Sequence, residues 1–194
     1  MHERSEIELL QLSQIDARTA EEIAAIHVAG LPYSINSLRG AKVVAWLYQE
    51  LAKSGHRIYV ARHEGKVVAV LALVDSEVTL FLQKLARREP LQWLRLASTK
   101  FVQISRLMRD AKAVERPRRR AGNHFYIASL AVADDHRRLG IARRLIDSVL
   151  EVARMNHRAV FVDTHRDNVV ARRFYEQVGF VQVAETKLSV VYRW

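Results

Sequence analysis

The sequence predicts a single α/β domain over residues 1–194, built on a mixed β-sheet. Runs rich in β-branched residues alternate with stretches whose apolar residues recur at helical spacing, which is typical of this fold class. Two neighbouring runs are separated only by a short turn, so part of the sheet is expected to be antiparallel. The chain is 49% hydrophobic and 27% charged, as in ordinary globular proteins, and it is long enough for a sizeable core.

The first part of the chain contains two predicted helices and a β-hairpin. Residues 19–29 are predicted to be helical because Ile23, Ile26 and His27 share one side, and "GLPYSIN" ends this helix. A second helix is expected over residues 39–53, where apolar residues again recur at helical spacing. The runs "RIYVAR" (57–62) and "KVVAVLALV" (66–74) are predicted strands, and "HEGK" between them is a hairpin signal.

The middle of the chain is predicted to be helical and carries a large positive net charge. Helices are expected over residues 79–89 and 91–113. The segment from Lys84 to Arg120 contains twelve Lys and Arg and three acidic residues, which gives it a net charge of +9. The rest of the chain is near neutral. This segment could be a solvated face, or it could contact an anionic partner such as an acidic acceptor, a nucleic acid or a membrane surface. No motif predicts sequence-specific nucleic-acid binding.

The last part of the chain alternates strands and helices. "HFYIASLAV" (124–132) is a predicted strand, followed by a polar turn and a helix that runs to about residue 155. Ile141, Leu145, Val149 and Val152 are expected to face a core from this helix. A strand over 159–164 and a helix over 167–178 follow, and residues 179–194 provide one or two final strands.

The turn after the strand at 124–132 has features of a phosphate-binding loop. It carries Arg137-x-x-Gly140-x-Ala142 at the start of a helix, where unpaired backbone N–H groups and the helix dipole favour an anion. Gly140 lacks a Cβ, Ala142 is small, and nearby arginines can pair with phosphate. The loop matches neither GxGxxG nor GxxxxGK[ST], so a dinucleotide or nucleoside triphosphate is not expected. Taken alone, the stretch is equally consistent with a solvated helix N-terminus.

Two motifs in order resemble one known family. "SLAVADDHRRLGIARRLIDSVL" resembles motif A of the GNAT superfamily of N-acetyltransferases, and "DNVVARRFYEQVGF" (167–180) is similar to its motif B. The resemblance implies a GNAT fold: a central mixed, mostly antiparallel sheet splayed at strands 4 and 5 and flanked by helices. It covers nearly the whole chain except residues 76–122, which look like a basic helical insertion found only in some members.

The resemblance implies acetyl-CoA, and hence coenzyme A, as a ligand. It places the pantetheine arm on the strand that ends at Val132 and the pyrophosphate on the amides of the following loop. The implied cofactor-binding residues are Leu130, Ala131, Val132, Arg137, Arg138, Leu139, Gly140, Ile141, Ala142, Arg143, Asn168, Ala171, Phe174 and Tyr175. For Asn168 and Gly179, local roles as helix N-cap and C-cap are also expected.

The implied reaction is direct attack of a primary amine on the thioester. The amine must be neutral, the developing oxyanion needs a hydrogen-bond donor, and the leaving thiolate needs a proton. The resemblance makes Tyr175 the general acid, although a half-buried structural tyrosine is the alternative interpretation. Many members carry a Glu six residues before the position of Val132; here Tyr126 occupies that place. His124, Asp75 and Glu77 are substitute candidates for the base.

The acceptor amine is not fixed by the sequence. Tyr33, Ser34 and Asn36 lie between the first two helices, which the family uses on the acceptor side, so they are substrate candidates for a small-molecule or peptide amine. The missing Glu keeps a second hypothesis open: a non-catalytic module on a GNAT fold that binds coenzyme A or an anionic partner. Monomer and homodimer are both open.

The composition excludes several classes of function. The chain has no cysteine, hence no disulfide and no thiolate chemistry, and its eight histidines show no HExxH pattern, so no metal site is predicted. The longest apolar run, "VVAVLALV", is too short to span a bilayer, and the N-terminus has no apolar signal core. A cytoplasmic protein is therefore expected. His27 and His63 are expected to be ordinary core or surface residues.

Overall fold

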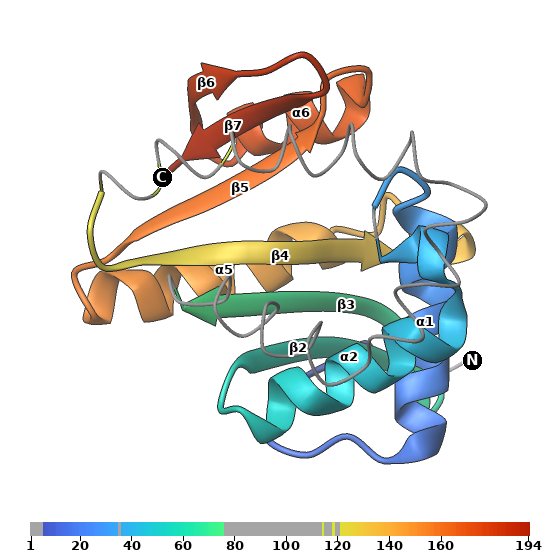
Figure 1. Cartoon of the computed structure of the whole chain (residues 1–194). Helices are drawn as coiled ribbons and strands as arrows, with labels where there is room; N and C mark the ends of the chain where they lie inside the picture. The colour runs from blue at the N-terminus through green and yellow to red at the C-terminus, as the bar shows by residue number, and fades with distance from the viewer. Residues whose placement is uncertain (1–5, 35, 76–113, 115–117, 119–120) are drawn as a thin grey trace, which may run out of the picture. The chain divides into compact units, whose positions relative to one another are not determined.

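The computed structural model describes residues 6–34, 36–75, 114, 118 and 121–194 (Figure 1). The helices expected at 79–89 and 91–113, and most of the basic insertion at 76–122, lie outside the described residues. The chain divides into two compact units, Met1–Leu73 with Ile127–Asn156, and Val74–Tyr126 with His157–Trp194. The division falls inside two strands, Lys66–Asp75 and His124–Val132, and each unit is described below by itself.

The strands of the first unit are mostly antiparallel. β1 (Glu8–Leu12) pairs with β2 (Arg57–His63), which pairs with β3 (Lys66–Asp75). The predicted hairpin is confirmed: its two turn residues, Glu64 and Gly65, have φ of 50° and 75°, which suits the twist of the flanking strands. β4 (His124–Val132) has the predicted bounds, whereas β1 was not predicted.

Helices cover both faces of these strands. α1 (Ala17–Gly30) begins at Asp16, whose side chain accepts a hydrogen bond from the Thr19 amide at 2.7 Å. α2 (Ala41–Lys53) and α5 (Ile141–Met155) both contact β2, with α2 in front of the strands and α5 behind them in Figure 1. β3 is therefore buried continuously from Val67 to Val74. The buried face of α5 is made by Ile141, Leu145, Ile146, Val149, Leu150 and Ala153, whereas Val152 is only half-buried.

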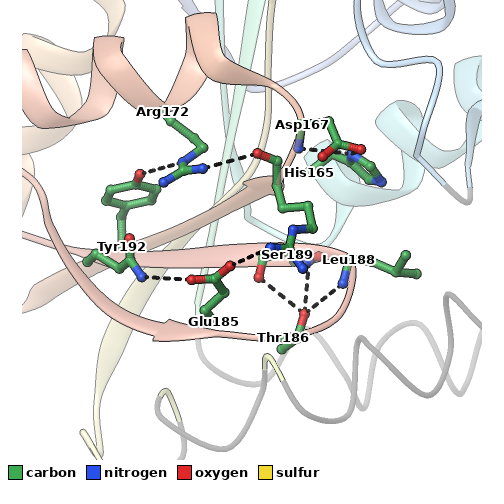
Figure 2. A network of polar contacts seen from close by, with 10 residues as sticks. His165, Asp167, Arg172, Glu185, Thr186, Leu188, Ser189 and Tyr192 are labelled. Carbon is green, nitrogen blue, oxygen red and sulfur yellow. Dashed lines mark hydrogen bonds and ion pairs between the residues drawn. The ribbon is translucent and has the colours of Figure 1, made fainter.

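The second unit consists of the start of β4 followed by β5 (Ala159–His165), α6 (Val169–Gln177), β6 (Val181–Glu185) and β7 (Ser189–Arg193). β7 pairs antiparallel with both β5 and β6. Figure 2 shows how α6 is tied to β7: Arg172 Nε donates to the Tyr192 hydroxyl at 3.4 Å. The same hydroxyl donates to Glu176 at 2.9 Å, so two side chains of α6 meet one residue of the strand.

Both predicted caps of α6 are confirmed. The Asn168 side chain accepts a hydrogen bond from the Ala171 amide at 3.1 Å, which is the geometry of an N-cap. Gly179 follows the end of the helix with a φ of 94°, a conformation that costs glycine little. These local signals fix where the helix begins and ends.

The strand order is β1-β2-β3-β4-β5-β7-β6, and β4 and β5 form the parallel pair. The sheet is thus mixed and mostly antiparallel, as predicted. The splay between β4 and β5 stays a prediction. Within the described part of the chain, no helix is long and apolar enough to cross a membrane.

Candidate functional site

The loop between β4 and α5 is held by contacts within the first unit. The Ala133 amide donates to the Val68 carbonyl at 2.8 Å. The short 3-10 helix η2 (Asp134–His136) follows, and His136 Nε2 lies 2.9 Å from Nδ1 of His63 on β2. The Arg137 guanidinium forms an ion pair of 2.6 Å with Asp134. The loop is therefore fixed to β2 and β3 before the helix begins.

Gly140 starts α5 in the left-handed region, with φ 75° and ψ 1°, and no side chain caps the helix. A Cβ built on Gly140 would meet no atom within 4 Å. The glycine is thus required by its backbone conformation, while the space beside it is open toward solvent. An uncapped helix N-terminus presents backbone N–H groups and the positive end of the helix dipole. This place can accept an anion such as a pyrophosphate.

The arginines around Gly140 are exposed and differ in their contacts. Arg143 pairs with Asp147 at 3.0 Å, and Arg144 donates to the Ile7 carbonyl at 3.1 Å. Arg138 adopts a positive φ of 64°, which a side chain bearing a Cβ rarely does. Exposed ion pairs of this kind stabilise a fold little, so Arg137 and Arg143 can exchange their partners for a phosphate at small cost. Leu139 between them is also exposed.

The predicted acceptor residues lie in one short loop between α1 and the 3-10 helix η1 (Ser37–Arg39). Tyr33 is 58% exposed, and Ser34 Oγ accepts a hydrogen bond from the Asn36 amide at 3.2 Å. The loop starts where α1 meets β4, because a Cβ on Gly30 would lie only 3.0 Å from Cβ of Ala131. The first unit therefore brings the predicted acceptor loop next to the end of the predicted pantetheine strand.

A buried chain of polar groups, which the sequence did not predict, joins α1, α2 and β4. His27 Nδ1 lies 2.8 Å from the Tyr48 hydroxyl, which lies 2.7 Å from Ser129 Oγ. All three residues are buried, and burial lowers the pKa of His27 to about 4. His27 Nε2 is buried without a hydrogen-bond partner among the described residues. This series of hydrogen bonds ends at Ser129, the neighbour of Leu130, so it fixes the two helices against the predicted pantetheine strand.

Tyr175 is buried in an aromatic cluster of the second unit. Only 5% of it is exposed, and its ring contacts Phe174, Phe180 and Tyr192. Burial raises the pKa of Tyr175, and the negative charge of Asp163 raises it further. A phenol in these surroundings stays protonated, as a proton donor requires. The packing is also what a structural tyrosine would show, so the catalytic role stays a prediction.

Tyr126 is paired with a carboxylate that the sequence analysis missed. Its hydroxyl donates to Asp163 Oδ1 on β5 at 2.6 Å, and the Arg118 guanidinium lies 4.0 Å from its ring centroid. Burial raises the pKa of Tyr126, and the charge of Asp163 adds to the effect. The only local signal for Asp163 was one acidic residue inside the apolar run "AVFVDT", which could not reveal its partner.

Two of the substitute bases are engaged in other contacts. Asp75 forms an ion pair of 2.7 Å with Arg158, whose guanidinium also stacks on Phe125. His124 is buried, its Nδ1 lies 2.7 Å from the Gly122 carbonyl, and burial lowers its pKa. Glu77 lies outside the described residues. Among the described residues, the hydrogen-bonded pair of Tyr126 and Asp163 is therefore a further candidate for the base.

Comparison with known proteins identifies the family of the chain. The sequence model of the acetyltransferase (GNAT) family matches residues 21–180. The chloroplastic GCN5-related N-acetyltransferase 6 of Arabidopsis thaliana is 40% identical over 67 residues, which is 34% of this chain. That match spans only 23% of the length of the Arabidopsis protein.

Solved structures share the fold. PH1933 from Pyrococcus horikoshii OT3 has a TM-score of 0.62 at 16% identity over 97% of both chains. A polyamine N-acetyltransferase of Drosophila melanogaster, which catalyses the formation of N-acetylagmatine, has a TM-score of 0.56 at 16% identity, covering 96% of this chain and 99% of its own. At such identities the likeness shows the fold alone. The family match itself runs from within α1 past the end of α6, so the chain belongs to the GNAT family of acetyltransferases.

Proposed function

We propose that the protein transfers an acetyl group from acetyl-CoA to a primary amine. The observation that carries the proposal is the uncapped N-terminus of α5 at Gly140, open beside the glycine and surrounded by exposed arginines. This arrangement follows directly on β4, where the resemblance places the pantetheine arm. Membership of the acetyltransferase family supports the same function.

The residues of the first unit fit such a donor. The amides from Arg138 to Arg143 would hold the pyrophosphate, and the β4 residues Leu130, Ala131 and Val132 would hold the pantetheine. Asn168, Ala171, Phe174 and Tyr175 remain proposed contacts from the second unit. The bound thioester supplies an activated acetyl group; the protein orients the amine and moves protons. Tyr175, protonated in its aromatic cluster, would donate a proton to the leaving thiolate.

The acceptor is proposed to be a small-molecule or peptide amine near the loop of Tyr33, Ser34 and Asn36. This loop adjoins β4 through the close approach of Gly30 to Ala131. An anionic partner for Lys84–Arg120 stays a prediction, because that segment lies almost wholly outside the described residues. The cytoplasmic location also stays a prediction.

Calorimetry with acetyl-CoA tests the donor. We expect binding that weakens in an Arg138→Ala, Arg143→Ala variant, whereas no binding at millimolar acetyl-CoA would refute the proposal. Release of free thiol is then measured with a panel of polyamine, amino sugar, aminoglycoside, peptide N-terminus and lysine peptide. Binding of acetyl-CoA without turnover of any amine would favour a non-catalytic binding module instead.

A further inference from the structure

A phenol and a carboxylate meet inside the second unit, which also holds the second phenol of the predicted site. Tyr126 comes from β4, Asp163 from β5 and Tyr175 from α6. The bond from Tyr126 to Asp163, at 2.6 Å, has the short length of a hydrogen bond to a charged acceptor. The negative charge of Asp163 contributes to the raised pKa of both Tyr126 and Tyr175.

Asp163 is a half-buried carboxylate on a strand whose preceding residues are all apolar. It lies opposite Val191 of β7 and two residues after the buried Phe161, so it shares that residue's face of β5. Tyr126 packs against the apolar cluster of Val114, Phe161 and Val191. Taking a carboxylate partly out of water costs free energy unless it is hydrogen-bonded, and such groups gather at functional sites.

We propose that Tyr126 and Asp163 together accept the proton that the amine loses during acetyl transfer. The inference rests on the proposed function and deepens it. Tyr126 would be the catalytic residue that contacts the amine, and Asp163 a positioning residue that acts through it. Tyr175, in the same cluster, would serve the leaving group.

The proton transfers balance in the following way. As the nitrogen bonds to the carbonyl carbon, its N–H becomes acidic and gives its proton to the Tyr126 oxygen. Tyr126 passes its own proton to Asp163 Oδ1 in the same step. The carbon–sulfur bond breaks, and the sulfur takes the proton of Tyr175. Asp163 later releases its proton to solvent, and Tyr175 takes a proton from solvent. Both residues thereby return to their starting protonation states.

The surroundings explain why the two residues must act together. Burial and the nearby negative charge raise the pKa of Tyr126, so this phenol does not ionise by itself at neutral pH. It can accept a proton only while giving one up, and Asp163 is the acceptor within hydrogen-bond distance. The charged and titratable groups around this cluster include Arg118, whose guanidinium lies 4.0 Å from the ring centroid of Tyr126, and Tyr175.

Asp163→Asn is the decisive substitution. The amide oxygen of Asn can still accept the Tyr126 hydrogen bond, so the fold and acetyl-CoA binding should persist while the carboxylate is lost. We expect kcat to fall by roughly 100-fold, the usual scale of general base catalysis, and the acid limb of the pH profile of kcat/KM to lose the ionisation of the carboxylate and keep only that of the amine. Glu151→Gln, which removes an exposed carboxylate on α5, should change neither.

A second variant separates catalysis from structure. Tyr126→Glu in the Asp163→Asn background puts a carboxylate on β4, and it should recover part of kcat together with a carboxylate ionisation in the acid limb of the pH profile. Independently of any acceptor, ultraviolet titration should show a tyrosine that ionises at lower pH in Asp163→Asn than in the wild type, because a neighbouring negative charge is gone.

The outcomes are distinguishable. A wild-type rate in Asp163→Asn, or a lower rate with an unchanged pH profile and no recovery by Tyr126→Glu, would overturn the role of the pair while leaving acetyl transfer intact. If the wild-type protein binds acetyl-CoA but acetylates none of the amines, the proposed function fails and this inference falls with it.

Discussion

Lowering the pH from 8 to 5 is expected to destabilise the protein through His27. This histidine lies on the buried face of α1, only 2% exposed, with Nδ1 hydrogen-bonded to Tyr48 and Nε2 unpaired among the described residues. A positive charge there would lose its hydration without gaining a counter-charge. Burial accordingly lowers its pKa from 6.5 to about 4.

The sign and size of the effect follow from proton linkage. Below pH 6.5 the unfolded chain binds a proton at His27 that the folded protein binds only near pH 4. The contribution to stability is therefore fully present above the unfolded pKa and is lost as the pH falls toward the folded pKa. For these two pKa values, the free energy of unfolding should decrease by about 2 kcal/mol between pH 8 and pH 5.

Urea unfolding at several pH values measures this loss. In the His27→Asn variant, the amide can still reach the Tyr48 hydroxyl but does not titrate. The loss of about 2 kcal/mol between pH 8 and pH 5 that is assigned to His27 should therefore be absent from the free energy of unfolding of this variant. His157→Asn, a substitution of an exposed histidine, is the control and should keep the wild-type slope. Parallel curves for wild type and His27→Asn would refute the reasoning.

Three further substitutions test the loop, the cap and the acid. Gly140→Ala should lower the free energy of unfolding by about 1 kcal/mol because of the positive φ, and it should weaken acetyl-CoA binding in calorimetry. Gly55 has a similar φ and equally open space, so Gly55→Ala should cost the same stability without affecting binding. Asn168→Ala should lower the free energy of unfolding by about 1 kcal/mol and Asn168→Asp by much less; equal losses would exclude the cap. Tyr175→Phe should slow turnover and leave the Kd of acetyl-CoA almost unchanged; equal loss of both would indicate a structural tyrosine.

Much of the fold was predictable because its signals are local. The hairpin of β2 and β3 follows from two β-branched runs around Glu64 and Gly65, and the structure has it. The ends of α6 follow from a capping Asn168 and from Gly179, both confirmed. In each case the sequence neighbours themselves form the hydrogen bonds or the backbone conformation that the pattern predicts.

β1 shows where local signals fail. Its five residues are half-buried or exposed and show no clean alternation, and its pairing partner β2 lies almost fifty positions along the chain. Such a strand is stable because it adds hydrogen bonds to an existing sheet edge rather than because of its own pattern. For Gly140 the sequence indicated a missing Cβ beside the helix amides, and the structure adds a positive φ that this backbone position requires.

The sequence by itself determined the family motifs, the order of most strands and helices, and the glycine-containing turn before α5. Only the tertiary structure decided which polar groups meet: His27 with Tyr48 and Ser129, and Tyr126 with Asp163. Helix and strand patterns depend on neighbours within a few residues, so they can be read along the chain. A hydrogen bond between residues 37 positions apart, such as that of Tyr126 and Asp163, depends on how the strands are placed in the sheet, and no local pattern records that placement.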